Sequence, residues 1–195
     1  MFLSAAFVPP ARALESLTAV VDSVGPAAEL DRVPIEAMQI VVTHFGKVAL
    51  GDRRRLVDEL AASVPRLGPP MRLRFAGAAA LEWPGDCSVW AKLAGDLDAL
   101  GDIARGVPPL ARRAGFMVDR RAFRPWLSVG LVTPSTTVEY LSRLVEALDT
   151  CAEPEWLLPE LCLVRTRWDG AGTDIAAYEV LERFPLCGPV THTTG

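Results

Sequence analysis

Histidine is scarce in this sequence, which has only two among its 195 residues, His44 and His192. Metal-ligand spacing is also lacking, because the four cysteines are scattered and form no C-x-x-C pair. Reduced thiols in a cytoplasmic protein are the simpler interpretation of that scatter. We therefore expect no metal site, no cofactor and a cytoplasmic location.

Long apolar runs and a strong excess of one charge are absent as well. No stretch is long enough to cross a bilayer, and the first residues lack the basic segment and apolar run of a signal peptide. The net charge of -4 argues against broad nucleic-acid binding by the whole surface, although a local basic cleft is compatible with it. Half of the residues are hydrophobic, so we expect one packed domain over residues 1–187 and a flexible tail over 188–195.

Two short apolar strands organise the chain, one over residues 37–48 and one over 123–132. In the first, regular alternation puts Gln39, Val41 and Thr43 on one face and His44 on the other. In the second, Trp126 shares a face with the residue two positions further on. Each strand therefore directs a pair of residues, spaced by two, toward one side of its sheet.

Strands and helices alternate along the rest of the chain in two similar halves, each of which contributes one of the two apolar strands. Pro108 and Pro109 fall inside one apolar helical pattern and predict an interruption of that helix. Apolar spacing predicts helices around 14–24, 51–64, 96–113 and 138–148, and strands around 2–8, 71–75, 78–83, 87–93, 158–167 and 174–184.

The frame around the two strands resembles that of a known family. Residues 33–36 (VPIE) precede the first strand, Phe45-Gly46 ends it, and Phe123-Arg124-Pro125 introduces the second. In order and spacing, these segments resemble the 2H phosphoesterase superfamily, in particular its bacterial 2′,5′ RNA ligase and RNA 2′,3′-cyclic phosphodiesterase branch. The resemblance implies an α+β fold of two pseudo-symmetric lobes. Two antiparallel sheets would face each other across a central cleft, with helices on the outside.

The family's two His-x-Thr/Ser motifs are degenerate in this sequence. Gln39 stands where the first histidine would be, Val41 where its threonine would be, and Trp126 where the second histidine would be; Ser128 alone keeps the family residue type. Opening a cyclic phosphate requires one proton to leave and another to arrive, a task that imidazoles perform near neutral pH. Glutamine and tryptophan cannot replace them, so we expect no catalytic residue at these four positions.

Two side chains near the motifs admit two interpretations each. His44 points away from the motif face under regular alternation, and a buried, hydrogen-bonded histidine is favoured over one that a β-bulge re-aims. Trp126 either stacks on a nucleobase or fills the space left by the histidines and their phosphate, and we favour filling.

The sequence thus leaves two functional hypotheses. The preferred one is a catalytically degenerate protein that binds a nucleotide, an RNA end or a protein partner in the central cleft, without membrane or metal. The alternative is an active phosphoesterase or RNA-end-processing enzyme that uses catalytic residues foreign to the family. For either, the expected ligand-binding residues are Gln39, Thr43, Arg124, Trp126, Ser128 and Arg165.

Overall fold

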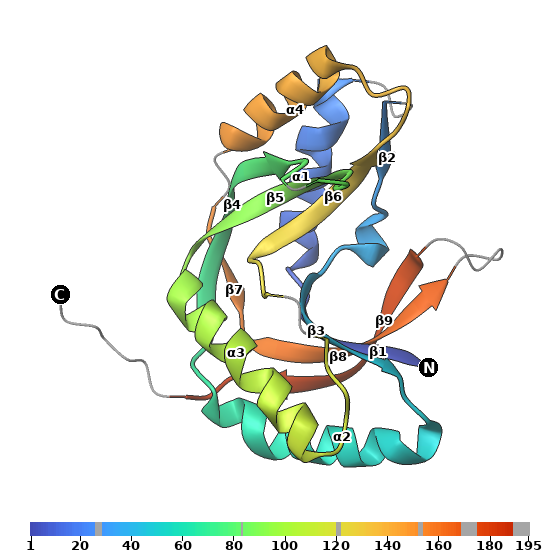
Figure 1. Cartoon of the computed structure of the whole chain (residues 1–195). Helices are drawn as coiled ribbons and strands as arrows, with labels where there is room; N and C mark the ends of the chain where they lie inside the picture. Colours follow the sequence, from blue (N-terminus) through green and yellow to red (C-terminus); the bar gives the residue numbers. More distant parts are fainter. Residues whose placement is uncertain (26–28, 83, 120–121, 152–153, 169–174, 189–195) are drawn as a thin grey trace.

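The computed structural model describes residues 1–25, 29–82, 84–119, 122–151, 154–168 and 175–188. Over these residues the chain forms two antiparallel β-sheets, each covered by helices on its outer side (Figure 1). The predicted tail at 188–195 falls almost entirely outside the described residues.

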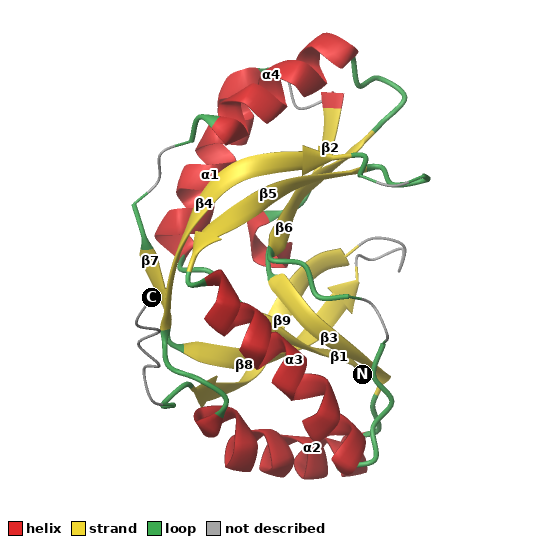
Figure 2. Ribbon diagram, turned by 60° about the vertical axis from the view of Figure 1, so that its left-hand side comes forward, coloured by secondary structure: helices red, strands yellow, loops and turns green. Residues whose placement is uncertain are grey.

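The first sheet joins the two ends of the chain. Its strand order is β3-β1-β8-β9, with β1 (Phe2–Phe7) antiparallel to both β3 (Ile40–Lys47) and β8 (Glu160–Trp168), and β9 (Ile175–Pro185) at the far edge. Helix α2 (Leu50–Ser63) and helix α3 (Leu97–Arg113) lie on its outer side (Figure 2). The first motif strand, β3, is therefore an edge strand.

The second sheet has the order β2-β6-β5-β4-β7. Its strands are β2 (Leu30–Arg32), β4 (Met71–Ala80), β5 (Ser88–Gly95), β6 (Trp126–Val132) and β7 (Trp156–Leu158). Helices α1 (Ala11–Val24) and α4 (Val138–Asp149) pack together on its outer side (Figure 1). The second motif strand, β6, lies between β2 and β5.

Alternation along β1 separates the two sides of the first sheet. Leu3, Ala5 and Phe7 are buried in the large core that the sheets share with the helices. Ala6 points the other way and packs in a small separate cluster with Cys162 and Val164. We call this second side the cleft face of the first sheet. The uncovered sides of the two sheets are turned toward each other, as Figure 2 shows.

The observed architecture confirms the predicted α+β fold of two antiparallel sheets facing across a central cleft with helices outside. The lobes are interleaved, however, because β1 lies in the first sheet, β2 in the second and β3 in the first again. Two short turns of 3-10 helix lie between these elements: η2 (Ile35–Ala37) connects β2 to β3, and η3 (Val64–Arg66) follows α2. No helix among the described residues is both long and apolar enough to cross a membrane.

Two local predictions were wrong. Helix α3 continues through Pro108 and Pro109 instead of stopping there. Each proline removes one backbone hydrogen bond, but burial of Val107 and Leu110 on either side offsets that loss. The strands expected at 71–75 and 78–83 are largely one strand, β4, whose pairing with β5 shifts register between Phe75 and Ala78. A bulge at this shift explains the apparent break in the sequence pattern.

Candidate functional site

A β-bulge in the first motif strand changes which of its side chains face the cleft. Val41 pairs with Ala6 of β1, Thr43 pairs with Ala5, and His44 pairs with Ser4, so one extra residue of β3 lies between the first two pairs. Directly paired residues of antiparallel strands project to the same side. His44 therefore shares the cleft face with Val41, whereas Thr43 projects to the opposite side. The regular alternation predicted for this strand was wrong at these two residues.

Thr43 is held inside the protein by the loop that follows α3. Its side chain is 1% exposed, and its hydroxyl donates a hydrogen bond of 2.8 Å to Asp119 Oδ1. The backbone N–H of His44 also donates to Asp119 Oδ1, at 3.3 Å. The Thr43 hydroxyl is already hydrogen-bonded to Asp119. Thr43, which was predicted to bind a ligand, therefore supports the strand from its helix-covered side.

His44 is held on the cleft face by Ser4. The Oγ atom of Ser4 and the Nδ1 atom of His44 are 2.7 Å apart, a short hydrogen bond between side chains. Ser4 is 1% exposed, whereas the imidazole is only half-buried. The pair thus consists of a buried hydroxyl and a ring that extends toward the cleft.

Gln39 lies immediately before β3, and its side chain is 7% exposed. Its amide lies near the Tyr178 hydroxyl and affects the pKa of that group. Burial raises the pKa of Tyr178, and the Gln39 side chain offsets part of this rise. The contact does not have hydrogen-bond geometry, because neither amide atom of Gln39 has a hydrogen-bond partner among the described residues. Both atoms are covered, so a ligand reaches them only if the surrounding side chains move.

The second motif strand presents a compact set of aromatic and basic side chains. Trp126 pairs with Lys92 of β5, and Ser128 pairs with Trp90, so all four project to the cleft side of the second sheet. The indoles of Trp90 and Trp126 are 6.3 Å apart between ring centroids. The Lys92 ammonium lies 5.6 Å from the Trp126 ring centroid. We call Trp90, Lys92, Trp126 and Ser128 the β5–β6 cluster.

Arg124 extends this cluster toward the start of β6. Its guanidinium carbon lies 4.9 Å above the Trp126 ring centroid. Trp126 therefore has a cation from its own segment and another from β5 against its ring, a favourable arrangement because the aromatic face is electron-rich. The indole is half-buried and keeps exposed surface, so it does not seal off the face on which it lies.

Like Thr43, Arg165 is a predicted ligand-binding residue that the fold places away from the cleft face. It pairs with Leu3, whose side chain belongs to the helix-covered core, so Arg165 projects away from the cleft face. Its guanidinium forms an ion pair with Glu179 of the neighbouring strand. Of the six expected ligand-binding residues, the structure brings together Arg124, Trp126 and Ser128.

Sequence reasoning missed the contributions of Trp90, Lys92 and Ser4. Alternation within the predicted strand at 87–93 already puts Trp90 and Lys92 on one face, which is a usable signal. Their position beside the second motif depends on the order of strands in the sheet, which no local pattern gives. The Ser4 contact depends in addition on the bulge in β3.

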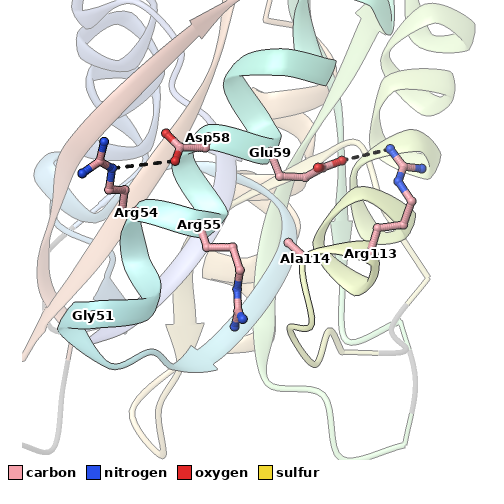
Figure 3. A pocket seen from close by; sticks show the side chains of 7 residues that line it. All are labelled: Gly51, Arg54, Arg55, Asp58, Glu59, Arg113 and Ala114. Atoms are coloured by element: carbon pink, nitrogen blue, oxygen red, sulfur yellow. Dashed lines mark hydrogen bonds and ion pairs between the residues drawn. The ribbon is translucent and has the colours of Figure 1, made fainter.

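The hollow drawn in Figure 3 lies on the outer side of the first sheet, between α2 and α3, away from the β5–β6 cluster. Its volume is about 600 Å³. Arg54 pairs with Asp58 and Arg113 with Glu59. Arg55, the third arginine of the lining, pairs with Asp52. Within the described residues, no group of three or more histidine, cysteine or acidic side chains is placed to hold a metal ion.

Solved structures with the same fold give this arrangement a context. LigT of E. coli in its apo form has a TM-score of 0.73 at 19% identity, over 95% of this chain and 96% of LigT. LigT complexed with 3′-AMP has a TM-score of 0.70 at 17% identity, over 94% and 97%. TT0787 of Thermus thermophilus has a TM-score of 0.67 at 19% identity, over 96% and 99%.

These likenesses extend over nearly the whole length of both chains. No protein-family model matches the sequence, and no curated protein matches it. The chain has the two-lobed fold of the 2H phosphoesterases, as the sequence frame predicted.

Proposed function

We propose that the protein binds a nucleotide or a nucleotide-like RNA end on the cleft side of its second sheet and does not turn it over by the two-imidazole reaction. The β5–β6 cluster carries this proposal. An indole surface stacks on nucleobases of any sequence, and adjacent cations attract the phosphate. Trp126 supplies the indole surface. Lys92 and Arg124 supply the cations, which lie 5.6 Å and 4.9 Å from the centroid of its ring.

The lack of turnover follows from the chemistry of the motif positions. Gln39 has no proton to exchange near neutral pH, and the Trp126 indole N–H is a donor only. Each general acid or base contributes about 10²–10⁴-fold to a reaction rate. A cleft that lacks an imidazole at both motif positions therefore still has the shape to bind a nucleotide, but it loses most of the rate enhancement of the two-imidazole reaction.

The structures of the same fold support a nucleotide as the ligand. LigT of E. coli has been crystallised with 3′-AMP, with ATP and with NADP+. An adenine nucleotide is the part common to all three ligands. We take adenine nucleotides as the first probes for the present chain, although its motif residues differ from those of the family.

Calorimetric titration with 3′-AMP tests the proposal. We expect saturable binding that Trp126→Ala weakens about ten-fold, since base stacking is worth about 1–3 kcal/mol. Lys92→Ala should weaken 3′-AMP binding more at low salt than at high salt, because salt screens the attraction between the ammonium and the phosphate. The chain's other lysine, Lys47, is exposed at the end of β3 and provides the matched control, Lys47→Ala. Absence of binding, or equal loss in both lysine variants, would contradict the proposal.

A second candidate function is favoured by the position of His44. The bulge in β3 brings this imidazole onto the cleft face, so an active phosphoesterase would have one acid–base group available. Incubation with 2′,3′-cyclic AMP distinguishes the two functions. Turnover that His44→Ala abolishes and His192→Ala leaves intact supports the enzyme, whereas binding without product supports the first candidate.

A further inference from the structure

The three central strands of the second sheet carry basic residues and no acidic ones. Strands β4, β5 and β6 contain no aspartate or glutamate, and their charged residues are Arg72, Arg74 and Lys92. We call these three residues the basic row. The middle of the second sheet therefore has positive charge that its own strands do not compensate.

Strand pairing puts the whole basic row on the cleft side of the sheet. Arg74 pairs with Ala94 of β5, which is two positions from Lys92, so Arg74 and Lys92 project to the same side. Arg72 shares that side, because Leu73 between the two arginines is buried on the other one. Arg72 is exposed and Arg74 is half-buried, so a ligand can reach both side chains.

The row leads away from the β5–β6 cluster across the sheet. Lys92 is the direct neighbour of Trp126. Arg74 is the diagonal neighbour of Lys92, at about 7 Å between Cβ atoms, and Arg72 lies about 7 Å further along β4. The row thus begins at the proposed nucleotide site and ends near the start of β4.

The two arginines of the row have no acidic partner in the described part of the chain. Their guanidinium groups form no ion pair or hydrogen bond with another described residue. Asp96 and Asp149 approach β4, but each accepts a backbone N–H of that strand, from Arg72 at 2.8 Å and from Ala78 at 2.7 Å. Neighbouring like charges repel each other, and a bound anion would remove that repulsion.

We propose that the basic row binds phosphates of a single-stranded RNA beyond the nucleotide that stacks on Trp126. This inference rests on the proposed nucleotide-binding function and extends the ligand from a nucleotide to a strand. Lys92 and Arg124 lie against the Trp126 ring and serve the first nucleotide. Arg74 and Arg72 come next along the sheet and serve the phosphates that follow. An aromatic surface continued by a track of cations is the arrangement that binds single strands.

Fluorescence anisotropy with a labelled hexa-adenylate RNA, measured over a range of salt concentrations, tests the row. For a single strand, each phosphate that a cation neutralises contributes about 0.7 to the slope of log affinity against log salt. A chain with both Arg72→Ala and Arg74→Ala should therefore lose about 1.4 from this slope and bind the RNA at least about ten-fold more weakly at low salt. An unchanged slope would overturn the proposal.

Arg12→Ala combined with Arg112→Ala is the matched control. It removes two exposed arginines from the outer helices α1 and α3, and neither of them forms an ion pair with another described residue. Both double variants change the net charge equally, and circular dichroism verifies that both are folded. A control that loses as much slope as the row variant would assign the effect to net charge and refute the row.

ATP and 3′-AMP separate a strand from a compact ligand. We expect the row variant to weaken the binding of both much less than it weakens the binding of hexa-adenylate. Equal weakening of ATP and RNA would assign the row to a triphosphate. Equal weakening of 3′-AMP and RNA would place the row in the site of the first nucleotide, and either result would overturn the strand.

Failure of this inference is distinguishable from failure of the proposed function. If 3′-AMP binds, loses affinity in Trp126→Ala and the RNA slope stays unchanged in the row variant, the row is refuted and nucleotide binding stands. If neither 3′-AMP nor the RNA binds the wild-type chain, the proposed function is refuted, and the row that rests on it falls too.

Discussion

Thr43 Oγ1 and Asp119 Oδ1 are 2.8 Å apart and join the first motif strand to the loop after α3. Thr43 is almost fully buried, and the same carboxylate oxygen accepts the backbone N–H of His44. This carboxylate therefore holds the strand segment in which the bulge turns His44 toward the cleft. Its loss should affect both stability and the position of the imidazole.

We expect Asp119→Ala to lower the free energy of unfolding by about 1–3 kcal/mol, because the buried Thr43 hydroxyl loses its acceptor. Urea denaturation followed by circular dichroism measures the change. Glu15→Ala, at an exposed position of α1, is the control and should change stability by less than about 0.5 kcal/mol. Equal stability of Asp119→Ala and wild type would contradict the structural role.

Gly95 permits a close approach of two strands at the end of β5. Its φ is +112°, and a Cβ atom there would lie 2.3 Å from the carbonyl oxygen of Arg72. Gly95→Ala should therefore destabilise the protein by several kcal/mol or prevent folding. Gly51 in α2 has open space within 4 Å of the position that an added methyl group would take, so Gly51→Ala should be neutral or stabilise by up to about 1 kcal/mol. Thermal unfolding of the pair checks this contrast.

Gln39 is expected to cost stability in the unliganded protein, since both of its amide atoms are covered and lack a hydrogen-bond partner among the described residues. Gln39→Leu, which has a similar volume, should raise the free energy of unfolding by about 1 kcal/mol. Gln39→Ala should lower it, because it leaves a cavity. Denaturant titrations of both variants give the two signs. A leucine variant less stable than wild type would show that the amide makes a favourable interaction.

Cys162 should be the least reactive of the cysteines in the folded state. Burial on the cleft face raises the pKa of its thiol from 9.0 to about 11, so at pH 8 only about one molecule in a thousand carries the thiolate. Cys87 and Cys187 are exposed and should react rapidly with a thiol reagent. We expect a slow fraction that disappears in Cys162→Ala and becomes fast in denaturant. Rapid labelling of Cys162 in the folded protein would contradict its burial.

The same pKa has a consequence for stability. Because the folded-state pKa is raised, the contribution of Cys162 is fully present below about pH 9 and is lost as the pH rises through about 11. The wild type should therefore lose stability in this pH range more steeply than Cys162→Ala. Denaturant titrations at pH 8 and pH 10.5 measure the difference, and parallel pH profiles would contradict the assignment.

The amino-acid sequence by itself determined the positions of the two motif strands, and its resemblance to a known family predicted the fold class and the replacement of both motif histidines. Apolar periodicity and the residue types at positions 39, 41, 126 and 128 are local properties of the chain, so they can be read without coordinates. The order of segments around them carries the family resemblance, and that resemblance implied two sheets facing each other with helices outside.

The tertiary structure decided which side chains meet. A single extra residue in β3 exchanged the sides of Thr43 and His44, because each step along a strand reverses the direction of the side chain. The pairing of β5 with β6 put Lys92 and Trp90 beside the second motif, and the pairing of β8 with β1 turned Arg165 away from the cleft. Register between strands far apart in sequence depends on how the whole core packs, and for that reason no local pattern could supply it.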